Sequence, residues 1–444
     1  REKEFSKTEV QNIEQYHEKF PKERMPRVLL IVDEFQEFYA EDDNIKQEVD
    51  DKFDRIVRKG RAFGINTLFS SQTLSGSSIK KSTKELIDIR IALMCSDLDS
   101  NQILDDRNPA ARDLTRPGEG IYNAENGKVE GNRRFQAFFI EKDDLSKTID
   151  SVVSFAKANE NCYKNFKQTI FRGSEKALME KESHPLKKIT VVSSPKSLRL
   201  WLGEPVAIAE DVTAVIIKQG GSNLLVVGYD ENIGVRVMCS SIISIAAQQQ
   251  SNTAKFYSFN FYNVDSDLVN IPDELFNNIQ QDCKSVSNRE VKETLQTIKE
   301  EIGKRLTGNV PNSPNIYLAF FSLQRGRPFR KDGYSMSEEG NLLDSILKEG
   351  PDVGVYSLVQ VDTMDNFSKN LDDNLLKEFS QRVASQMNPD NSVKVIGNQK
   401  AAKLGNNRAW YYDDNKNTMI KFKPYDLPTF SWIASLQSKS SILS

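Results

Sequence analysis

Two adjacent carboxylates follow a run of apolar residues near the start of the chain. The run is VLLIV at 28–32, and Asp33 and Glu34 come directly after it. Apolar runs rich in β-branched residues are typical of parallel strands, so we predict a strand buried on both faces. Ligands of open α/β sheets bind at the carboxyl ends of the strands. In nucleotide hydrolases, the first carboxylate at this place holds Mg²⁺ through water and the second polarises the attacking water. A polar turn that merely ends the strand is the structural alternative.

A polar amide is predicted to reach the same edge of the sheet. Residues 49–61 carry apolar side chains at the spacing of one helix face, and Gly64 ends the helix. Residues 65–70 are predicted to form a second buried strand, and Gln72 follows it. A helix followed by a strand forms a crossover unit, which places Gln72 beside the two carboxylates. An amide there can sense the γ-phosphate or orient the attacking water.

Length and composition limit the classes of protein that fit. A chain of 444 residues, 38% hydrophobic and 28% charged, predicts two or three globular domains. The apolar runs are strand-sized, so no transmembrane helix is predicted. Four widely spaced cysteines form no metal-ligand pattern and are typical of reduced thiols in a cytosolic protein. The presence of only two histidines argues against a histidine metal site or a Ser-His triad. A net charge of −3 gives no overall attraction to nucleic acid.

An ordered set of motifs resembles the FtsK/SpoIIIE family of ring-forming ATP-driven translocases. The matching pieces, in chain order, are VDEF at 32–35, GRAFGI at 60–65, SQ at 71–72, IRIAL at 89–93, DSNQILD at 99–105, PGEGIY at 117–122 and FQAFFI at 135–140. One such piece is weak evidence, whereas the set in this order and spacing is specific. The resemblance covers roughly residues 25 to 145.

The resemblance implies roles for the residues at the sheet edge. Asp33 corresponds to the Walker B carboxylate, which holds Mg²⁺ through water. Glu34 corresponds to the catalytic base and Gln72 to the sensor. Asp33 and Gln72 would therefore contact bound ATP.

The resemblance also implies an arginine that acts on a neighbouring subunit's nucleotide. Arg90 is placed for that role, with Arg58 and Arg61 as rival candidates. A solvated helix face is the structural alternative for each of them. Arg90 has a counterpart in Arg382, later in the chain, so a structural ion pair at both arginines is a further alternative.

A family motor also needs a phosphate-binding loop of the type G-x-x-x-x-G-K-[ST] before its Walker B strand. No such motif precedes Asp33. We therefore predict that the chain is the C-terminal part of a longer protein, cut between the phosphate loop and the Walker B strand. We also expect this part to hydrolyse ATP negligibly by itself.

The second half of the chain repeats the first. Gly350 and Gly354 match Gly60 and Gly64, each 290 residues later. The second copy also has the front half that the first lacks, because residues 203–208 and 222–228 resemble the family's entry into its phosphate loop.

The catalytic residue types are missing from this second copy. No lysine follows Gly228, and the loop continues through Asp230 and Glu231 to Gly234. The acidic pair would repel a phosphate. Arg236 could contact an anion, or it could pair with Asp230 or Glu231.

The hydrolytic positions are also replaced. We align Phe320 and Phe321 with Asp33 and Glu34, and Asp362 with Gln72. Loss at every position predicts a degenerate domain that binds no nucleotide.

Together these features predict two tandem RecA-like α/β domains of the P-loop NTPase class. Residues 1–150 would be the C-terminal part of a hydrolytic domain, 151–187 a connector, and 188–444 a degenerate domain. ATP and Mg²⁺ would bind only at the first site of the complete protein.

Three functional classes are compatible with this organisation. Frequency within the family narrowly favours a DNA translocase. Type VII protein-secretion ATPases are the alternative, because they resemble this chain in stringing such domains together with degenerate copies toward the C-terminus. A non-catalytic docking or regulatory module is the third. The expected partners are further copies in a hexameric ring and either DNA or a secreted protein. The expected place is the cytoplasm, with any membrane anchor supplied by upstream segments.

Overall fold

The chain folds into two compact units, Arg1–Lys167 and Gln168–Ser444. The structure is a computed structural model and describes residues 1–23, 25–39, 44–74, 79, 81–159, 170, 173, 175–181, 184–189, 191, 195, 197–207, 209–250, 253–308 and 313–438. The division between the units falls inside the predicted connector. In the described part of the chain, no helix is long and apolar enough to cross a membrane.

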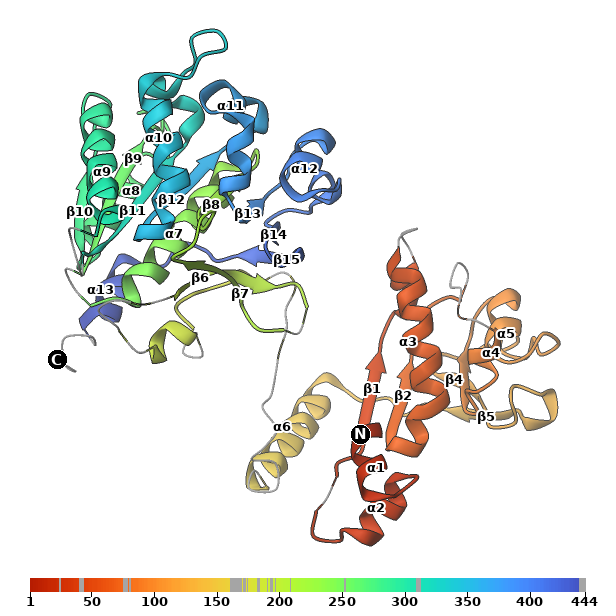
Figure 1. The fold of residues 1–444 in the computed structure, drawn as a ribbon. Helices are drawn as coiled ribbons and strands as arrows, with labels where there is room; N and C mark the ends of the chain where they lie inside the picture. The colour runs from red at the N-terminus through yellow and green to blue at the C-terminus, as the bar shows by residue number, and fades with distance from the viewer. Residues whose placement is uncertain are drawn as a thin grey trace. The chain divides into compact units, whose positions relative to one another are not determined.

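Unit 1 holds two small sheets with helices around them (Figure 1). Its elements are α1 (Glu2–Thr8), α2 (Ile13–Lys19), β1 (Val28–Val32), η1 (Phe35–Tyr39), α3 (Asn44–Gly60), η2 (Arg61–Phe63), β2 (Ile65–Phe69), α4 (Lys81–Lys84), β3 (Arg90–Leu93), α5 (Asp97–Ile103), β4 (Glu119–Asn123), η3 (Val129–Gly131), β5 (Arg133–Gln136) and α6 (Lys142–Ala158). Strands β1 and β2 pair in parallel, whereas β3, β4 and β5 form a separate antiparallel sheet.

The prediction that the first strand is buried on both faces is wrong for this chain. The β1–β2 pair is covered on one face by α3, where the rings of Phe53 and Phe69 lie 4.7 Å apart. Along β1 the side chains alternate, and Leu29 and Ile31 are each 60% exposed. The continuous apolar run made both faces look buried, but the described residues of unit 1 cover only one of them.

Unit 2 contains a ten-stranded sheet. Its elements are η5 (Pro185–Lys188), β6 (Ser197–Pro205), β7 (Val212–Ile217), β8 (Leu224–Val227), α7 (Glu231–Ala247), β9 (Ala254–Asn260), α8 (Ile271–Asn277), β10 (Asp282–Ser285), α9 (Val291–Leu306), β11 (Asn315–Phe321), η6 (Leu323–Arg325), η7 (Arg327–Phe329), α10 (Glu338–Glu349), η8 (Pro351–Val353), β12 (Val355–Val361), α11 (Met364–Asn370), η9 (Asp373–Glu378), β13 (Gln381–Ala384), α12 (Pro389–Ile396), η10 (Lys400–Lys403), β14 (Ala409–Asp413), β15 (Thr418–Pro424) and α13 (Phe430–Ser438).

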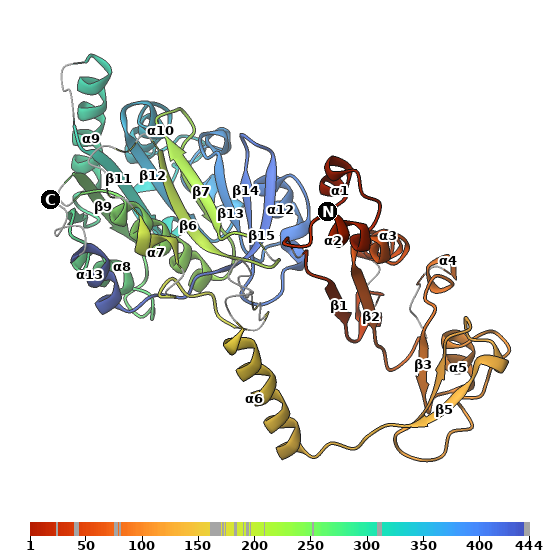
Figure 2. The same cartoon turned by 90° about the horizontal axis from the view of Figure 1, so that it is seen from below.

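The sheet of unit 2 has a parallel half and an antiparallel half. Its order is β10-β9-β11-β12-β8-β13-β14-β15-β6-β7. The first six strands run in parallel, and the remaining pairings are antiparallel. Figure 2 shows α9 and α10 on one side of this sheet and α7 and α8 on the other. One face packs on α7 and α8, and the other on α9, α10 and α11. The predicted parallel-rich α/β class is confirmed.

The internal repeat is visible in backbone geometry. Gly64 and Gly354 both adopt the left-handed conformation that glycine tolerates, at φ 67° and 82°. The carbonyl of each accepts the same hydrogen bond from the start of the neighbouring strand, 2.9 Å from Val28 N and 2.9 Å from Ile316 N. The matching glycines, the matching hydrogen bonds and the matching pairings of β1–β2 with β11–β12 and of β3-β4-β5 with β13-β14-β15 support the repeat.

The second unit begins earlier than the predicted residue 188. Ala177, Met179 and Leu186 are buried in its core, and Ala177 forms a parallel bridge with Tyr425. The predicted boundary at residue 150 also differs from the structure, because α6 runs across it. Polar composition marked these segments as a connector, whereas three well-spaced apolar side chains anchor the latter part.

A histidine buried in unit 2 makes the stability of this unit sensitive to acid. His184 packs against Trp201 and Tyr425, with ring centroids 6.1 and 5.2 Å away. Burial, and to a lesser extent Lys187, lowers the pKa of His184 to about 4.

We expect the unfolding free energy of unit 2 to fall as the pH drops from 6.5 toward 4. Over that range the unfolded state binds a proton that the folded state does not bind, so protonation favours unfolding. Over this pH range the unfolding free energy should fall by about 3 kcal/mol in total. Urea unfolding at several pH values measures it, and His184→Phe should have a shallower acid dependence. Equal slopes for the two proteins would contradict the assignment.

Candidate nucleotide-hydrolysis site and its degenerate copy

The structure brings Asp33, Glu34 and Gln72 to one edge of the β1–β2 sheet. The two carboxylates follow β1, and Gln72 follows its parallel neighbour β2. Gln72 Nε2 donates to Glu34 Oε1 at 2.7 Å. The Ser70 hydroxyl donates to Asp33 Oδ1. Parallel strands end at the same edge, so local sequence and strand direction together suffice to assemble this group.

Glu34 is held in a special backbone conformation and in a specific hydrogen-bond environment. Its φ is 50°, a left-handed value that costs free energy in a non-glycine residue and often marks functional sites. Hydrogen bonds from the Gln36 and Gln72 amides keep the pKa of Glu34 below its usual range. Glu34 is therefore a carboxylate at neutral pH and can accept a hydrogen bond from a water molecule.

Asp99 ties the segment after Gln72 to α5, a role that the sequence did not reveal. Its Oδ1 accepts from Thr73 Oγ1 and from the backbone N–H of Leu74, both at 2.9 Å. Asp99 N–H in turn donates to Ser96 Oγ at 3.0 Å, which caps the helix. The signal available in the sequence was the S-x-x-D capping pattern at 96–99.

Arg90 is buried rather than presented to a neighbour. Arg90 is 6% exposed, and its guanidinium donates to the backbone carbonyls of Lys84, Ile87 and Leu104. Arg382 is 7% exposed and donates in the same way to the carbonyls of Leu376, Phe379 and Val395. It also pairs with Asp414 at 3.1 Å. This shared arrangement favours the structural alternative for both arginines.

The two rival arginines lie at the end of α3 and just beyond it. Arg58 is exposed and pairs with Asp54 at 3.0 Å, and Arg61 is exposed in η2. Both precede β2, so they lie toward the opposite edge of the sheet from Gln72.

The strand registers correct the alignment of the missing carboxylates by one residue. Val28 pairs with Ile65, and Ile316 pairs with Val355, 290 residues after Ile65. Counting from these pairs, Asp33 and Glu34 correspond to Phe321 and Ser322, not to Phe320 and Phe321. Ser322 has φ 57°, like Glu34, which supports this register. The error arose because the apolar run of β11 extends one residue further.

The counterpart of the phosphate loop is occupied by the chain's own groups. The Asp230 carboxylate caps α7 by accepting from Asn232 N and Ile233 N at 3.0 and 3.2 Å. These are helix N-terminal donors of the kind that bind phosphate. A side chain at Gly228 or Gly234 would collide with the side chain of Ser385 or of Gln360.

Two further carboxylates of the copy, Glu231 and Asp362, are hydrogen-bonded internally. Glu231 accepts from Arg325 and from Gln324 Nε2, the latter at 2.9 Å. At the position of Gln72, Asp362 accepts from Asn366 Nδ2 at 2.9 Å. These pairs leave the degenerate site with its charges satisfied.

The predicted ion pair of Arg236 with Asp230 or Glu231 is wrong. Its guanidinium lies 3.5 Å from Asp426 and donates to Asn407 Oδ1 at 2.6 Å. Neither Asp230 nor Glu231 is its partner, because each of these carboxylates is engaged elsewhere. Its partners come from sequence-distant segments, which no local pattern indicates.

We expect unit 2 to bind no ATP in a Mg²⁺-dependent manner at its degenerate site. Asp230→Ala should lower the unfolding free energy by about 1 kcal/mol, because it removes a helix cap. It should not create Mg²⁺-dependent binding, since the loop still lacks its lysine. Calorimetric titration of the chain and of this variant with MgATP measures both points. Tight Mg²⁺-dependent binding that changes with loop substitutions would overturn the degenerate assignment.

The second unit shows which strand the first site lacks. In unit 2, β8 lies between β12 and β13 and runs parallel to both. The corresponding strands of unit 1, β2 and β3, belong to different sheets, and no strand lies between them in the described part of unit 1. In the described part of unit 1 there is thus no counterpart of β8 or of the loop that β8 leads into.

The two units have the α/β topology of the P-loop NTPase fold in tandem, and unit 1 carries paired carboxylates at its sheet edge. No known family model matches the chain. In sequence it is similar to the DNA translocase FtsK of Caldanaerobacter subterraneus subsp. tengcongensis, with 26% identity over 232 residues. That match covers 51% of this chain and 31% of the relative.

In fold, the chain is similar to type VII secretion ATPases. The cytoplasmic domain of EccC from Thermomonospora curvata superposes with a TM-score of 0.61 at 16% identity, covering 97% of this chain and 52% of that one. EccC ATPases 2 and 3 of the same organism, in complex with a signal sequence peptide, give 0.54 at 15% identity, covering 97% and 74%. The chain thus spans about a third of the FtsK relative and about half of the EccC cytoplasmic domain.

Proposed function

We propose that unit 1 carries the hydrolytic half of the ATPase site of a translocase motor, and that unit 2 is a structural, non-hydrolytic copy. The meeting of Asp33, Glu34 and Gln72 at one sheet edge supports this most strongly. In this proposal Asp33 holds Mg²⁺ through water, Glu34 polarises the attacking water, and Gln72 positions Glu34 and senses the γ-phosphate.

We propose that a phosphate-binding strand and loop from outside these 444 residues complete the first site. By analogy with β8, this strand would run in parallel between β2 and β3 and join the two sheets of unit 1. The exposed apolar side chains of β1, such as Leu29 and Ile31, would then be covered by the helix that follows that loop, as α7 covers one face of unit 2.

The substrate class that we favour is a protein. The tandem pair of domains, one of them degenerate, is similar to EccC over 97% of the chain, and one such EccC structure contains a signal sequence peptide. DNA is the second candidate, favoured by the 26% identity to FtsK. In this proposal the chain is part of a motor. The motor is a ring of identical copies that acts on the cytoplasmic side.

Stimulation of hydrolysis distinguishes the two substrates. The longer protein would be assayed for ATP turnover with duplex DNA and, separately, with the C-terminal segment of a secreted protein. We expect stimulation by the peptide and none by DNA. Stimulation by duplex DNA that weakens steeply with salt would instead favour a DNA translocase.

We further expect the 444-residue chain to hydrolyse ATP negligibly by itself. It supplies the carboxylates but no lysine-bearing phosphate loop, so no loop binds the phosphates of MgATP next to Glu34. A coupled assay of the chain and of its Glu34→Gln variant measures this. Turnover that is appreciable in the chain and abolished by the substitution would contradict the need for a completing strand.

A further inference from the structure

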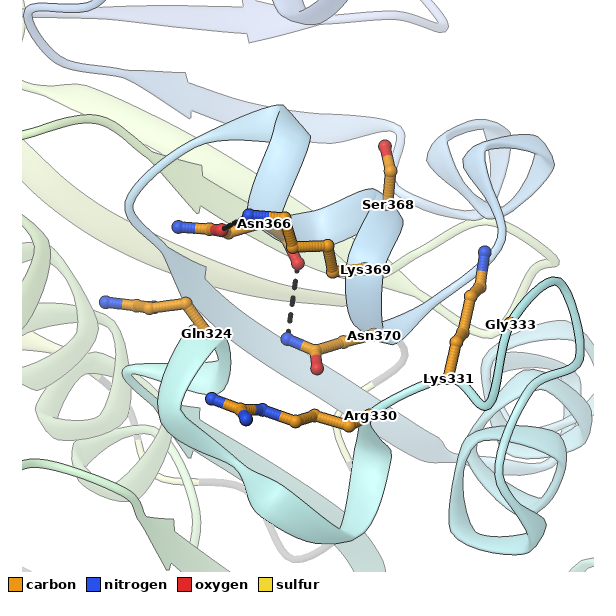
Figure 3. Close-up of a pocket in the computed structure, with 8 residues that line it drawn as sticks. All are labelled: Gln324, Arg330, Lys331, Gly333, Asn366, Ser368, Lys369 and Asn370. Atoms are coloured by element: carbon orange, nitrogen blue, oxygen red, sulfur yellow. Dashed lines mark hydrogen bonds between the residues drawn. The ribbon is translucent and has the colours of Figure 1, made fainter.

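A cavity of about 520 Å³ lies in unit 2 between the segment after β11 and helix α11 (Figure 3). Arg330 and Lys331 line it from the loop, and Lys369 and Asn370 line it from α11. The size is in the range of small-molecule sites. It is a different place from the phosphate-loop counterpart, whose loop residues 228–236 do not line it.

Three cations of this cavity have unused hydrogen-bonding capacity. In the described part of the chain, the side chains of Arg330 and Lys331 make no ion pair and no hydrogen bond. Lys369 Nζ donates once, to Asn366 Oδ1 at 3.0 Å. No carboxylate is among the described lining residues. Asp362 and Asp373 touch lining side chains, but they accept from Asn366 and Ser368.

The segment that carries Arg330 and Lys331 is anchored in the core of unit 2 and to α11. Arg330 follows Phe329, which is fully buried and packs edge-on against Phe320 at 5.7 Å. The backbone N–H of Lys331 donates to the carbonyl of Lys369 at 3.1 Å, which joins the loop to α11. Phe320 of β11 therefore helps to position this wall of the cavity.

A buried amide adds a second, independent sign of a ligand. Asn370 is 2% exposed, and its Nδ2 donates to the carbonyls of Leu323 and Asn366, both at 3.2 Å. Its Oδ1 is buried and has no partner. Buried polar atoms without partners are rare in folded proteins, so an unmatched acceptor on a cavity wall points to a missing donor.

We propose that this cavity binds a phosphate-bearing ligand of small-molecule size. A ligand with one carboxylate would balance only one of the three positive charges. A phosphate group carries nearly two negative charges and has three acceptor oxygens, so it matches the cavity better. The Arg330 guanidinium matches such a group in a two-pronged geometry, and the lysines act as point charges. Binding needs no Mg²⁺, because no carboxylate is available to share a metal.

The test is calorimetric titration of the whole 444-residue chain with inorganic pyrophosphate in the presence of a chelator. We expect saturable binding that Arg330→Ala combined with Lys331→Ala weakens by roughly tenfold or more, the usual effect of losing charged hydrogen bonds. Vesicles with a phosphomonoester headgroup then distinguish a lipid-borne phosphate from a soluble one.

Arg327→Ala is the matched control. Arg327 is exposed on the same segment and does not line the cavity, so its loss removes one positive charge but should leave pyrophosphate affinity within about twofold. Absence of saturable pyrophosphate binding, an equal effect of Arg327→Ala, or tighter binding of hexaglutamate than of pyrophosphate would overturn the proposal. The last result would identify an acidic peptide site instead.

Discussion

Arg90→Ala should destabilise unit 1 by about 3–5 kcal/mol, because three backbone carbonyl oxygens, one in a buried and two in partly buried hydrogen bonds, would lose their donor at about 1–3 kcal/mol each before relaxation. Arg382→Ala should destabilise unit 2 at least as much, since it also removes the cation that pairs with Asp414. Urea unfolding followed by circular dichroism measures both losses. Both guanidinium groups are almost completely buried and donate to backbone carbonyls of their own unit, so neither is presented to a neighbour's nucleotide.

Arg90→Lys is the informative companion variant. An ammonium group cannot reach three carbonyls arranged for a planar guanidinium, so we expect most of the destabilisation to persist. Arg58→Ala provides a control, because Arg58 is exposed to solvent and its pair with Asp54 should contribute little to stability. A catalytic role for Arg90 would instead show as lost turnover in the longer protein with an unchanged unfolding midpoint.

Glu34→Gln in the longer protein should reduce ATP turnover by about 10²–10⁴-fold while ATP still binds. The substitution keeps the shape of the side chain and its contact with Gln72, but it removes the negative charge that polarises the attacking water. Single-turnover kinetics with radiolabelled ATP separates binding from hydrolysis.

Asp33→Asn supplies the contrast for this experiment. It should weaken the Mg²⁺-dependent part of ATP binding, because Asp33 is assigned to the metal rather than to the water. If Glu34→Gln retained normal turnover, or if both substitutions weakened binding equally, the division of roles between the two carboxylates would be refuted.

The sequence alone determined the α/β class, the repeat and the residues at the carboxyl-end edge of the β1–β2 sheet. Strand-sized apolar runs, the glycines 290 residues apart and the direction of the crossover sufficed to place Gln72 beside Glu34. These are consequences of local periodicity and of the rule that parallel strands end together, so they need no knowledge of distant contacts.

Only the tertiary structure decided which side chains are engaged, and with what. The burial of Arg90, the pairing of Arg236 with Asp426, and the alignment of Ser322 with Glu34 depend on contacts or registers between distant segments. An arginine beside a nucleotide site and an arginine that braces backbone carbonyls look the same in sequence. They differ only in where their donors point, and packing of the whole unit fixes that direction.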